Sequence, residues 1–365
     1  MERADVPRLG RVMLIYWLMF GFPSSMALIE RDRARRFGFA WGFALIATIA
    51  LIGFRWQTGG DWSNYDRMVE QATWNPVDLS PLGDPGFALL LSFAARSHIG
   101  LLFVTAASGL VMGIALTRFC RDQPRPWLCM AVAVPYLVVV MGMGYIRQGM
   151  AISFLLMGLM TLRRGHVLRY SAWVVVGALF HSTAFILLPL GVMAVNRNVA
   201  VRVGLAVLGL AMLGYAIVSA HGGYVANYID SAMTSSGAAV RLFMTALPAA
   251  IFLGFRDRFA VEGAERSVWT ALSLAAIAAF ALLFAFRSST VVDRLGLYLI
   301  PVQCFVYARM PAAFARDANG ERLLTVAILL LYAAAFFIWL NYAVNVDYWL
   351  PYRFYFFEDG LCLAC

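Results

Sequence analysis

The chain has 365 residues, of which 62% are hydrophobic and only 13% are charged, and its mean hydropathy is +0.75. A soluble globular domain is about half apolar and about a quarter charged, so the composition excludes an ordinary soluble enzyme. It predicts an all-α integral membrane protein, a polytopic helical bundle with one membrane domain over residues 1–365. The net charge of +9 does not indicate a nucleic-acid partner, because the arginines that cause it are dispersed in short loops.

Ten apolar runs are candidates for membrane-spanning helices, each of which needs roughly 20 mostly apolar residues. They cover residues 12–29, 38–54, 99–117, 127–146, 147–162, 203–220, 241–255, 267–286, 294–310 and 323–342. The run 241–255 is short, and we expect it to be tilted or deep in the protein. Residues 86–96 are too few to span and predict a re-entrant or interfacial helix. With these additions the chain has about 10–13 transmembrane or re-entrant helices.

Residues 170–195 form a long apolar segment that is interrupted around His181. If this segment enters and leaves on the same side, 18 of the 29 arginines fall on one side of the membrane, which is then the cytoplasmic side. A single crossing would invert every later loop and remove this bias. We therefore expect a helical hairpin with His181 near its tip, although two short full crossings give the same parity. The outer loops are then 56–85, 221–240 and 343–365.

Three arginines, Arg147, Arg241 and Arg294, are each predicted to lie in the first turn of a helix that begins at the outer face. A helix N-terminus with an arginine beside it favours phosphate binding. A single such arginine has another explanation, because its long side chain can extend to the polar membrane interface. Three of them predict a cage for a diphosphate, with Arg287 and Asp293 on the same side.

The outer side also carries His181, Asp61, Tyr65, Trp62 and Gln148. A lone histidine in an apolar helix is often structural, but the polar flanks of His181 favour exposure to a cavity. Gly59-Gly60 permits a tight turn that presents Asp61 and Tyr65 on one face. The aromatic faces suit either the membrane interface or a sugar ring. Without a HExxH, P-loop or GxSxG motif, and with a single CxxC at Cys362 and Cys365, we predict neither a metal site nor a cofactor.

Several short motifs together resemble a known family. They are Gly60-Asp61-x-x-x-Tyr65, Asp84-Pro85-Gly86-Phe87, Arg147-Gln148-Gly149, Phe180-His181 and Asp293-Arg294. The chain resembles the EpsG-like family of Wzy-type polysaccharide polymerases over roughly residues 38–355. One departure is Asp84, which stands where we expect glutamate.

The resemblance implies a metal-independent glycosyltransferase of the GT-C type in the bacterial inner membrane, with its active site facing the periplasm. The donor would be a glycan on undecaprenyl diphosphate and the acceptor a second lipid-linked repeat unit, for exopolysaccharide or O-antigen synthesis. A flippase and a chain-length regulator would be partners. A glycan ligase or other lipid-linked-sugar transferase remains an alternative, as does a lipid-linked oligosaccharide transporter.

For the transfer reaction, the sequence offers candidates for three roles. His181 or Asp61 would deprotonate the acceptor hydroxyl, because histidine ordinarily titrates near neutral pH and carboxylates also serve as bases. Arg147, Arg241 and Arg294 would neutralise the diphosphate. Tyr65, Trp62 and Gln148 would hold the sugars.

Overall fold

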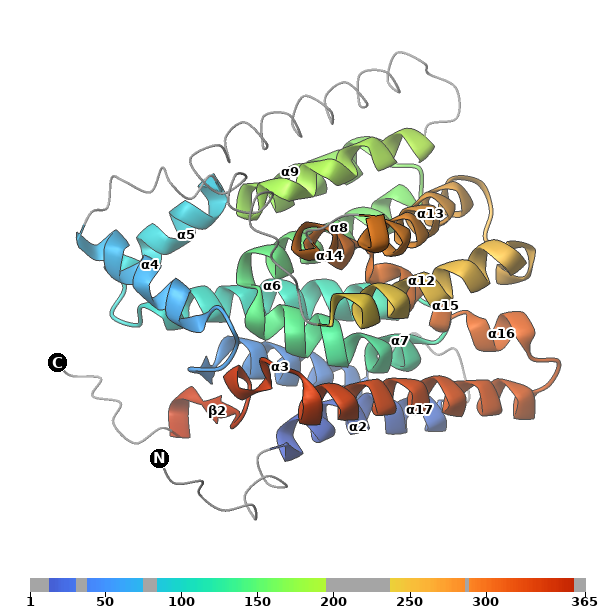
Figure 1. The fold of residues 1–365 in the computed structure, drawn as a ribbon, viewed down its shortest axis with the longest axis horizontal. Coiled ribbons are helices and arrows are strands. Elements are labelled where there is room, and N and C mark those ends of the chain that lie inside the picture. Colours follow the sequence, from blue (N-terminus) through green and yellow to red (C-terminus); the bar gives the residue numbers. More distant parts are fainter. Residues whose placement is uncertain (1–12, 31–37, 75–83, 195–236, 286–288, 358–365) are drawn as a thin grey trace.

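The computed structural model describes residues 13–30, 38–74, 84–194, 237–285 and 289–357, and Figure 1 shows them as a bundle of helices with broadly similar axis directions. The only sheet among the described residues is one pair of two-residue strands. The prediction of an all-α polytopic fold is confirmed.

Most elements follow the apolar runs of the sequence, whereas α4 (Trp62–Trp74) lies in the segment 56–85 that was predicted as an outer loop. The longer α-helices are α2 (Leu14–Ile29), α3 (Phe39–Gly53), α4 (Trp62–Trp74), α5 (Pro85–Arg96), α6 (Leu101–Arg121), α8 (Ile146–Leu162), α9 (Val167–Phe180), α12 (Ala238–Phe255), α13 (Gly263–Ala285) and α17 (Ala318–Tyr342). The shorter ones are α7 (Pro126–Ala133), α14 (Ser289–Gly296), α15 (Pro301–Tyr307) and α16 (Met310–Phe314). The remaining elements are the π-helix η3 (Val134–Gly142), the 3-10 helices η4 (Ser182–Ala194), η5 (Arg256–Phe259), η6 (Leu297–Leu299), η7 (Val346–Tyr348) and η8 (Tyr355–Phe357), and the strands β1 (Arg55–Trp56) and β2 (Arg353–Phe354).

By length and composition, four of the described helices are sufficient to cross a membrane, or five if one bent pair counts as a single span. The four are Leu101–Arg121, Ala238–Phe259, Gly263–Phe284 and Ala318–Tyr342. The other described apolar helices have 10–17 residues, and Pro85–Arg96 is among them, as expected for a segment that is too short to span. The run 203–220 lies outside the described residues.

Two predicted runs differ from the structure. The run 241–255 was expected to be a short helix. In the structure the helix extends beyond both ends of this apolar run, continues through η5 and reaches 22 residues. The run 294–310 was expected to be one helix, but it is broken and bends by 43° between Leu299 and Pro301. Proline cannot donate the backbone hydrogen bond that would continue a helix, so Pro301 starts a new one.

The hairpin at His181 is confirmed. The Tyr170 hydroxyl near the start of α9 donates a hydrogen bond of 2.5 Å to the Leu187 carbonyl in η4. Two residues 17 positions apart come this close only if η4 folds back along α9. His181 ends α9 and is therefore at the tip of the fold-back.

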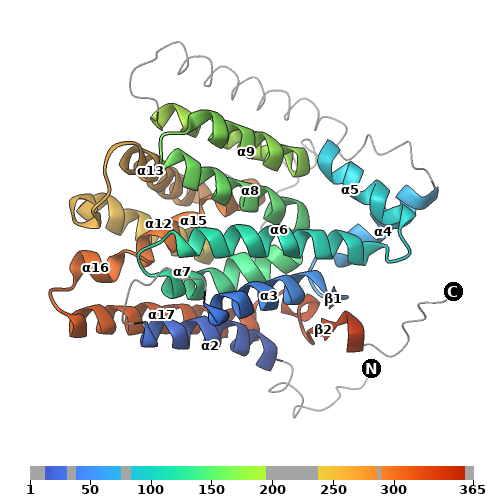
Figure 2. The same cartoon turned by 180° about the vertical axis from the view of Figure 1, so that it is seen from behind.

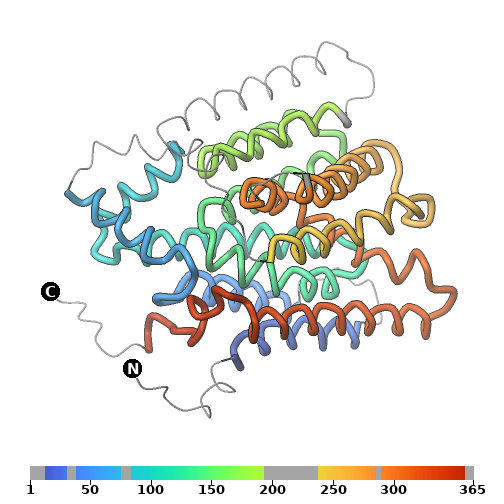
Figure 3. The backbone as a smooth tube through the Cα atoms, viewed as in Figure 1, coloured from blue at the N-terminus to red at the C-terminus, as the bar shows by residue number. Residues whose placement is uncertain are grey.

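The C-terminal part of the described chain packs across one end of the bundle. β1 and β2 pair antiparallel, with Arg55 opposite Phe354. The Trp349 ring donates from Nε1 to the Val139 carbonyl at 3.0 Å, and its carbonyl accepts from the Tyr16 hydroxyl at 2.5 Å. This segment therefore contacts α2, η3 and the loop after α3. Figure 2 shows β2 beside β1 at this end of the bundle, and Figure 3 shows the backbone as a tube.

Ion pairs gather at the opposite end of the bundle. Arg125 at the start of α7 pairs with Glu321 at the start of α17. Arg163 after α8 pairs with Asp122 after α6 at 2.8 Å, and Arg309 pairs with Glu265 at 3.0 Å. These contacts place the ends of α6 and α8 and the starts of α7, α13 and α17 at one end, as the arginine pattern predicted for loops that share a side.

Candidate functional site

The centre of the candidate site is Asp84, the residue that precedes α5. Its side chain is only 3% exposed. Oδ2 accepts a hydrogen bond from Nη1 of Arg147 at 3.1 Å, and Oδ1 accepts one from the backbone N–H of Ser182 at 2.8 Å. This single carboxylate therefore joins α5, the first turn of α8 and the tip of the α9–η4 hairpin.

His181 lies beside the same carboxylate. Its Nδ1 is 3.7 Å from Oδ2 of Asp84, and this nitrogen is buried without a hydrogen-bond partner among the described residues. The side chain as a whole remains 18% exposed. The distance to Asp84 is longer than a hydrogen bond.

Arg147 is in the first turn of α8, as predicted. Its backbone N–H donates to the Tyr65 hydroxyl at 3.5 Å, and its guanidinium lies over the Phe87 ring at 5.7 Å. Tyr65 itself is buried and packs edge-on against Phe87 at 5.6 Å. The structure therefore places Tyr65 inside the wall behind Arg147 and not on an open surface.

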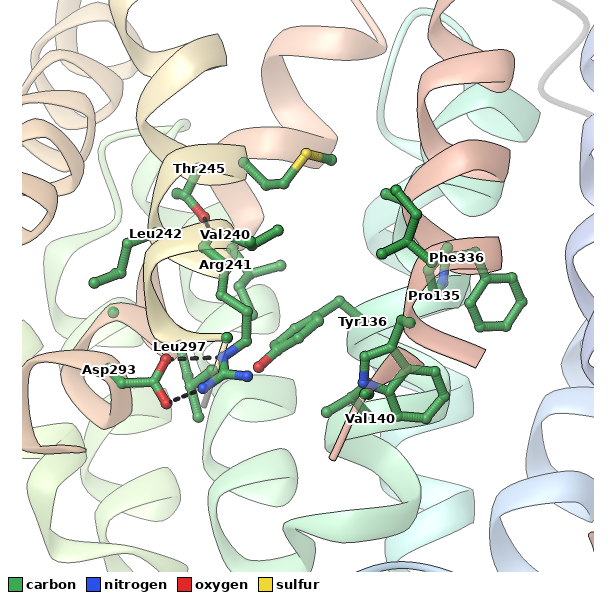
Figure 4. A pocket seen from close by; sticks show the side chains of 18 of the residues that line it. Pro135, Tyr136, Val140, Val240, Arg241, Leu242, Thr245, Asp293, Leu297 and Phe336 are labelled. Atoms are coloured by element: carbon green, nitrogen blue, oxygen red, sulfur yellow. Dashed lines mark hydrogen bonds and ion pairs between the residues drawn. The ribbon is translucent and has the colours of Figure 1, made fainter. Parts of the chain in front are cut away.

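A second charged pair lies on α12 and α14. Arg241, in the first turn of α12 as predicted, donates from Nε to Oδ1 of Asp293 at 2.9 Å and from Nη2 to Oδ2 at 2.5 Å. This fork-to-carboxylate geometry fixes the guanidinium plane. Figure 4 shows the pair at the edge of a cavity.

Arg294 differs from its predicted position. It lies in the last turn of α14 and not at the start of a helix, because α14 begins at Ser289, five residues before the predicted start. Its guanidinium lies over the Tyr145 ring at 5.6 Å and has no ion pair within the described part of the chain. Its backbone carbonyl accepts a hydrogen bond of 2.7 Å from Nε2 of Gln148, which ties α14 to α8. Oε1 of Gln148 is buried and has no partner among the described residues.

Asp61 lies close enough to Arg294 and Arg147 for both arginines to act on its charge. Burial raises the pKa of its carboxyl, while the nearby Arg294 and, less strongly, Arg147 lower it. The described residues contain no ion pair of Asp61 within 4.0 Å. The turn before it is the one predicted: Gly59 has φ of +107°, and a Cβ there would meet the Met143 carbonyl oxygen at 2.0 Å. Only glycine fits this approach, which holds Asp61 against the segment that leads into α8.

The remaining predicted residues are less central. Trp62 is half-buried and packs edge-on against Trp56 at 5.6 Å. Arg287 lies outside the described residues. No group of three or more His, Cys, Asp or Glu that could hold a metal occurs within the ranges that the structure describes.

Asp84 was not among the predicted site residues. Its sequence signals were its position before Pro85, which is typical of a helix start, and its place in one of the motifs. Neither signal indicates that the carboxylate would meet Arg147 and Ser182, which are 63 and 98 residues away in the sequence.

The fold and this cluster define a polytopic all-α membrane protein with a buried, charged site at one end of its bundle. A family model described as the EpsG family matches residues 39–354, so the chain belongs to the EpsG family. Comparison with curated proteins and with solved structures found no match. The family suggests a role like that of a polysaccharide polymerase.

Proposed function

We propose that the protein is a polysaccharide polymerase that joins undecaprenyl-diphosphate-linked repeat units at the outer face of the bacterial inner membrane. The observation that carries the proposal is the convergence of Arg147, Asp84 and His181 from three separate elements, with Arg147 and Arg294 both acting on the Asp61 carboxyl. This arrangement supports a reaction with an anionic leaving group and a hydroxyl nucleophile. The family assignment supports the same reading.

In the proposed reaction the acceptor hydroxyl oxygen attacks the anomeric carbon of the donor. A new glycosidic C–O bond forms, and the C–O bond to the diphosphate breaks. The hydroxyl proton passes to a base, and the diphosphate leaves with the bonding electron pair. No oxidant, reductant or nucleotide is needed for this balance.

His181 is the proposed base. Asp84 beside its Nδ1 would keep that nitrogen protonated and stabilise the imidazolium that forms when the other nitrogen takes the proton. Asp61 is the second candidate, because its half-buried carboxylate lacks an ion-pair partner among the described residues and its raised pKa makes it a stronger base than an exposed aspartate.

The arginines are proposed to stabilise the leaving group. A planar guanidinium binds phosphate oxygens in a bidentate manner, which suits charge that develops during bond cleavage. Arg294 is the best placed for this role, since no carboxylate in the described residues forms an ion pair with it. Arg147 and Arg241 are held in orientation by Asp84 and Asp293.

The glycan made by a strain that lacks the protein tests this proposal. We expect lipid carriers that bear only a single repeat unit, and complementation should restore the ladder of longer chains. Full-length polymer that is not joined to its final carrier would instead indicate a ligase. Repeat units trapped on the cytoplasmic side would indicate a transporter.

A further inference from the structure

A cavity of about 310 Å³ lies next to the charged site, between α12, η3 and α17. This volume is within the range of small-ligand sites. Most of its wall is apolar: Val240 and Met244 come from α12, Val140 from η3, and Ala335 and Ile338 from α17. Figure 4 shows these walls facing each other across the open space.

One end of the cavity is charged. Arg241 and Asp293 both line it, and Figure 4 shows Asp293 bonded to one side of the guanidinium while Tyr136 lies on the other. Tyr145 also lines the cavity, under the guanidinium of Arg294. Arg241 thus lines this end in an ion pair, whereas Arg294 lies behind the Tyr145 ring and forms no ion pair among the described residues.

The polar groups deeper in the cavity are already satisfied. Nε2 of Gln303 donates to the Thr245 hydroxyl at 2.7 Å, and Oε1 of Gln303 accepts from the Tyr332 hydroxyl at 2.5 Å. An apolar ligand can therefore fill this part without leaving these groups unpaired.

The rim of the cavity lies on surface that would face lipid. Val240 is 62% exposed, Ile338 57% and Tyr342 74%, and they belong to two helices long enough to span. Apolar side chains exposed on spanning helices face hydrocarbon. The cavity therefore opens sideways between α12 and α17, from the bilayer toward Arg241.

We propose that this cavity binds the isoprenoid segment next to the diphosphate of a lipid-linked substrate, which enters between α12 and α17 and places its diphosphate at Arg241 and Arg294. The inference rests on the proposed function and assigns a site to one of its substrates. The charged end complements an anionic head group, and the apolar walls complement a hydrocarbon chain. The small volume suits a single chain and not the paired chains of a phospholipid.

Matched tryptophan substitutions on the two walls test the site. Ala335→Trp fills the cavity from α17, whereas Ala334→Trp adds the same volume at the neighbouring exposed position, which does not line the cavity. Met244→Trp and Phe243→Trp form the same kind of pair on α12, since Phe243 is 49% exposed and also outside the lining. The full chain is purified in nanodiscs, and the affinity for undecaprenyl diphosphate is measured.

We expect Ala335→Trp and Met244→Trp to weaken this binding by about tenfold or more, a loss well resolved by a binding curve, and the two controls to stay within about twofold. Inorganic diphosphate, which has no tail, should bind both cavity variants as it binds the wild type. Wild-type affinity for undecaprenyl diphosphate in the folded cavity variants would overturn the assignment. Equal competition by phosphatidylglycerol would overturn it too, because the site would then be a general lipid groove.

A photoreactive isoprenoid diphosphate provides a second test that needs no substitution. When it is bound to the wild-type chain, we expect cross-links to the facing sides of α12 and α17, and cross-links confined to other helices would refute the site. The outcome is separable from that of the proposed function. If the deletion strain lacks the glycan ladder but the lipid binds elsewhere on the protein, only this site is refuted. If the lipid binds in the cavity but the deletion strain still polymerises, only the polymerase assignment is refuted.

Discussion

Asp84 shows how much of the site depends on one buried carboxylate. Oδ2 accepts a hydrogen bond from the Arg147 guanidinium and lies near the His181 imidazole, and Oδ1 accepts one from the Ser182 backbone N–H. Removing one partner of a buried charge pair leaves the other uncompensated, so such a residue influences both geometry and stability. The individual roles of His181, Arg147 and Asp61 must therefore be separated by substitutions that leave Asp84 in place.

His181→Gln retains approximate size and hydrogen-bonding ability but cannot carry the proton, whereas His181→Ala removes both. If His181 is the base, turnover should fall by roughly 10²- to 10⁴-fold in both variants. Both should remain folded and bind the lipid-linked donor. Purified protein assayed for chain extension provides the measurement. Activity that Gln largely restores, in step with thermal stability, would assign His181 a structural role.

Arg147→Lys keeps the positive charge but replaces the planar fork by an ammonium group. Since Arg147 contacts Asp84 through one terminal nitrogen, lysine can preserve the ion pair while losing donors for a phosphate. We expect turnover to fall by roughly tenfold or more, with the thermal midpoint almost unchanged. A variant with wild-type turnover would indicate that the arginine only anchors α8.

Asp61→Asn tests the buried carboxylate by its dependence on pH. Because burial raises the pKa of Asp61 in the folded protein, the folded state binds this proton more tightly than the unfolded chain. Above the folded-state pKa, the ionised carboxylate therefore destabilises the folded protein. This penalty decreases as the pH falls below that pKa and is lost once both states are protonated. We expect the thermal midpoint of Asp61→Asn to equal or exceed that of the wild type at neutral pH, with the difference shrinking in acid. A midpoint well below the wild type at neutral pH would mean that the carboxylate has a stabilising partner.

At the scale of elements, the close packing of α3 against α6 depends on small residues. A Cβ at Gly109 would meet the Ile49 carbonyl oxygen at 2.7 Å and the Gly53 nitrogen at 2.8 Å, both of them backbone atoms that cannot move aside. The Thr105 hydroxyl also donates to the Gly53 carbonyl at 2.6 Å across the same contact. Small residues at helix interfaces let backbones approach in this way.

Gly109→Ala should therefore separate the two helices and lower stability by about 1–3 kcal/mol. Gly21→Ala is the matched control, because nothing lies within 4 Å of a Cβ at that position in α2. Thermal unfolding of both variants in the same detergent provides the comparison. An unchanged thermal midpoint for Gly109→Ala would show that α3 and α6 can move apart without loss of stability.

The sequence could predict most elements but only part of the site. Apolar length located α2, α3, α6 and α13 to within a few residues, and the polar flanks of His181 located the hairpin tip. The break before Pro301 was missed because its flanks are as apolar as a continuous helix. Arg294 was misplaced because α14 begins at Ser289, before the apolar run. The contacts of Asp84 depend on packing between distant segments, which no local pattern encodes.

At the scale of the whole molecule, the two ends of the bundle differ in how they use charge. One end has ion pairs such as Arg125 with Glu321 and Arg163 with Asp122, in which both side chains stay partly exposed. The other has the cluster of Asp84, Arg147 and His181, in which the carboxylate is buried. The arginine bias predicts that the first end lies in the cytoplasm and the second outside. The proposed chemistry requires this orientation, because lipid-linked repeat units would be joined at the outer face.

Single cysteines in an otherwise cysteine-free chain test the orientation directly. Ser63 at the start of α4 and Gly165 between α8 and α9 are both exposed and lie at opposite ends of the bundle. We expect Ser63→Cys in intact cells to react with an impermeant thiol reagent added outside, and Gly165→Cys to react only after the membrane is opened. The cysteines to be replaced include the buried Cys120, Cys129 and Cys304, so the background protein must first be shown to retain activity. Labelling of Gly165→Cys from outside, with Ser63→Cys protected, would place the charged cluster in the cytoplasm and contradict the outer-face reaction.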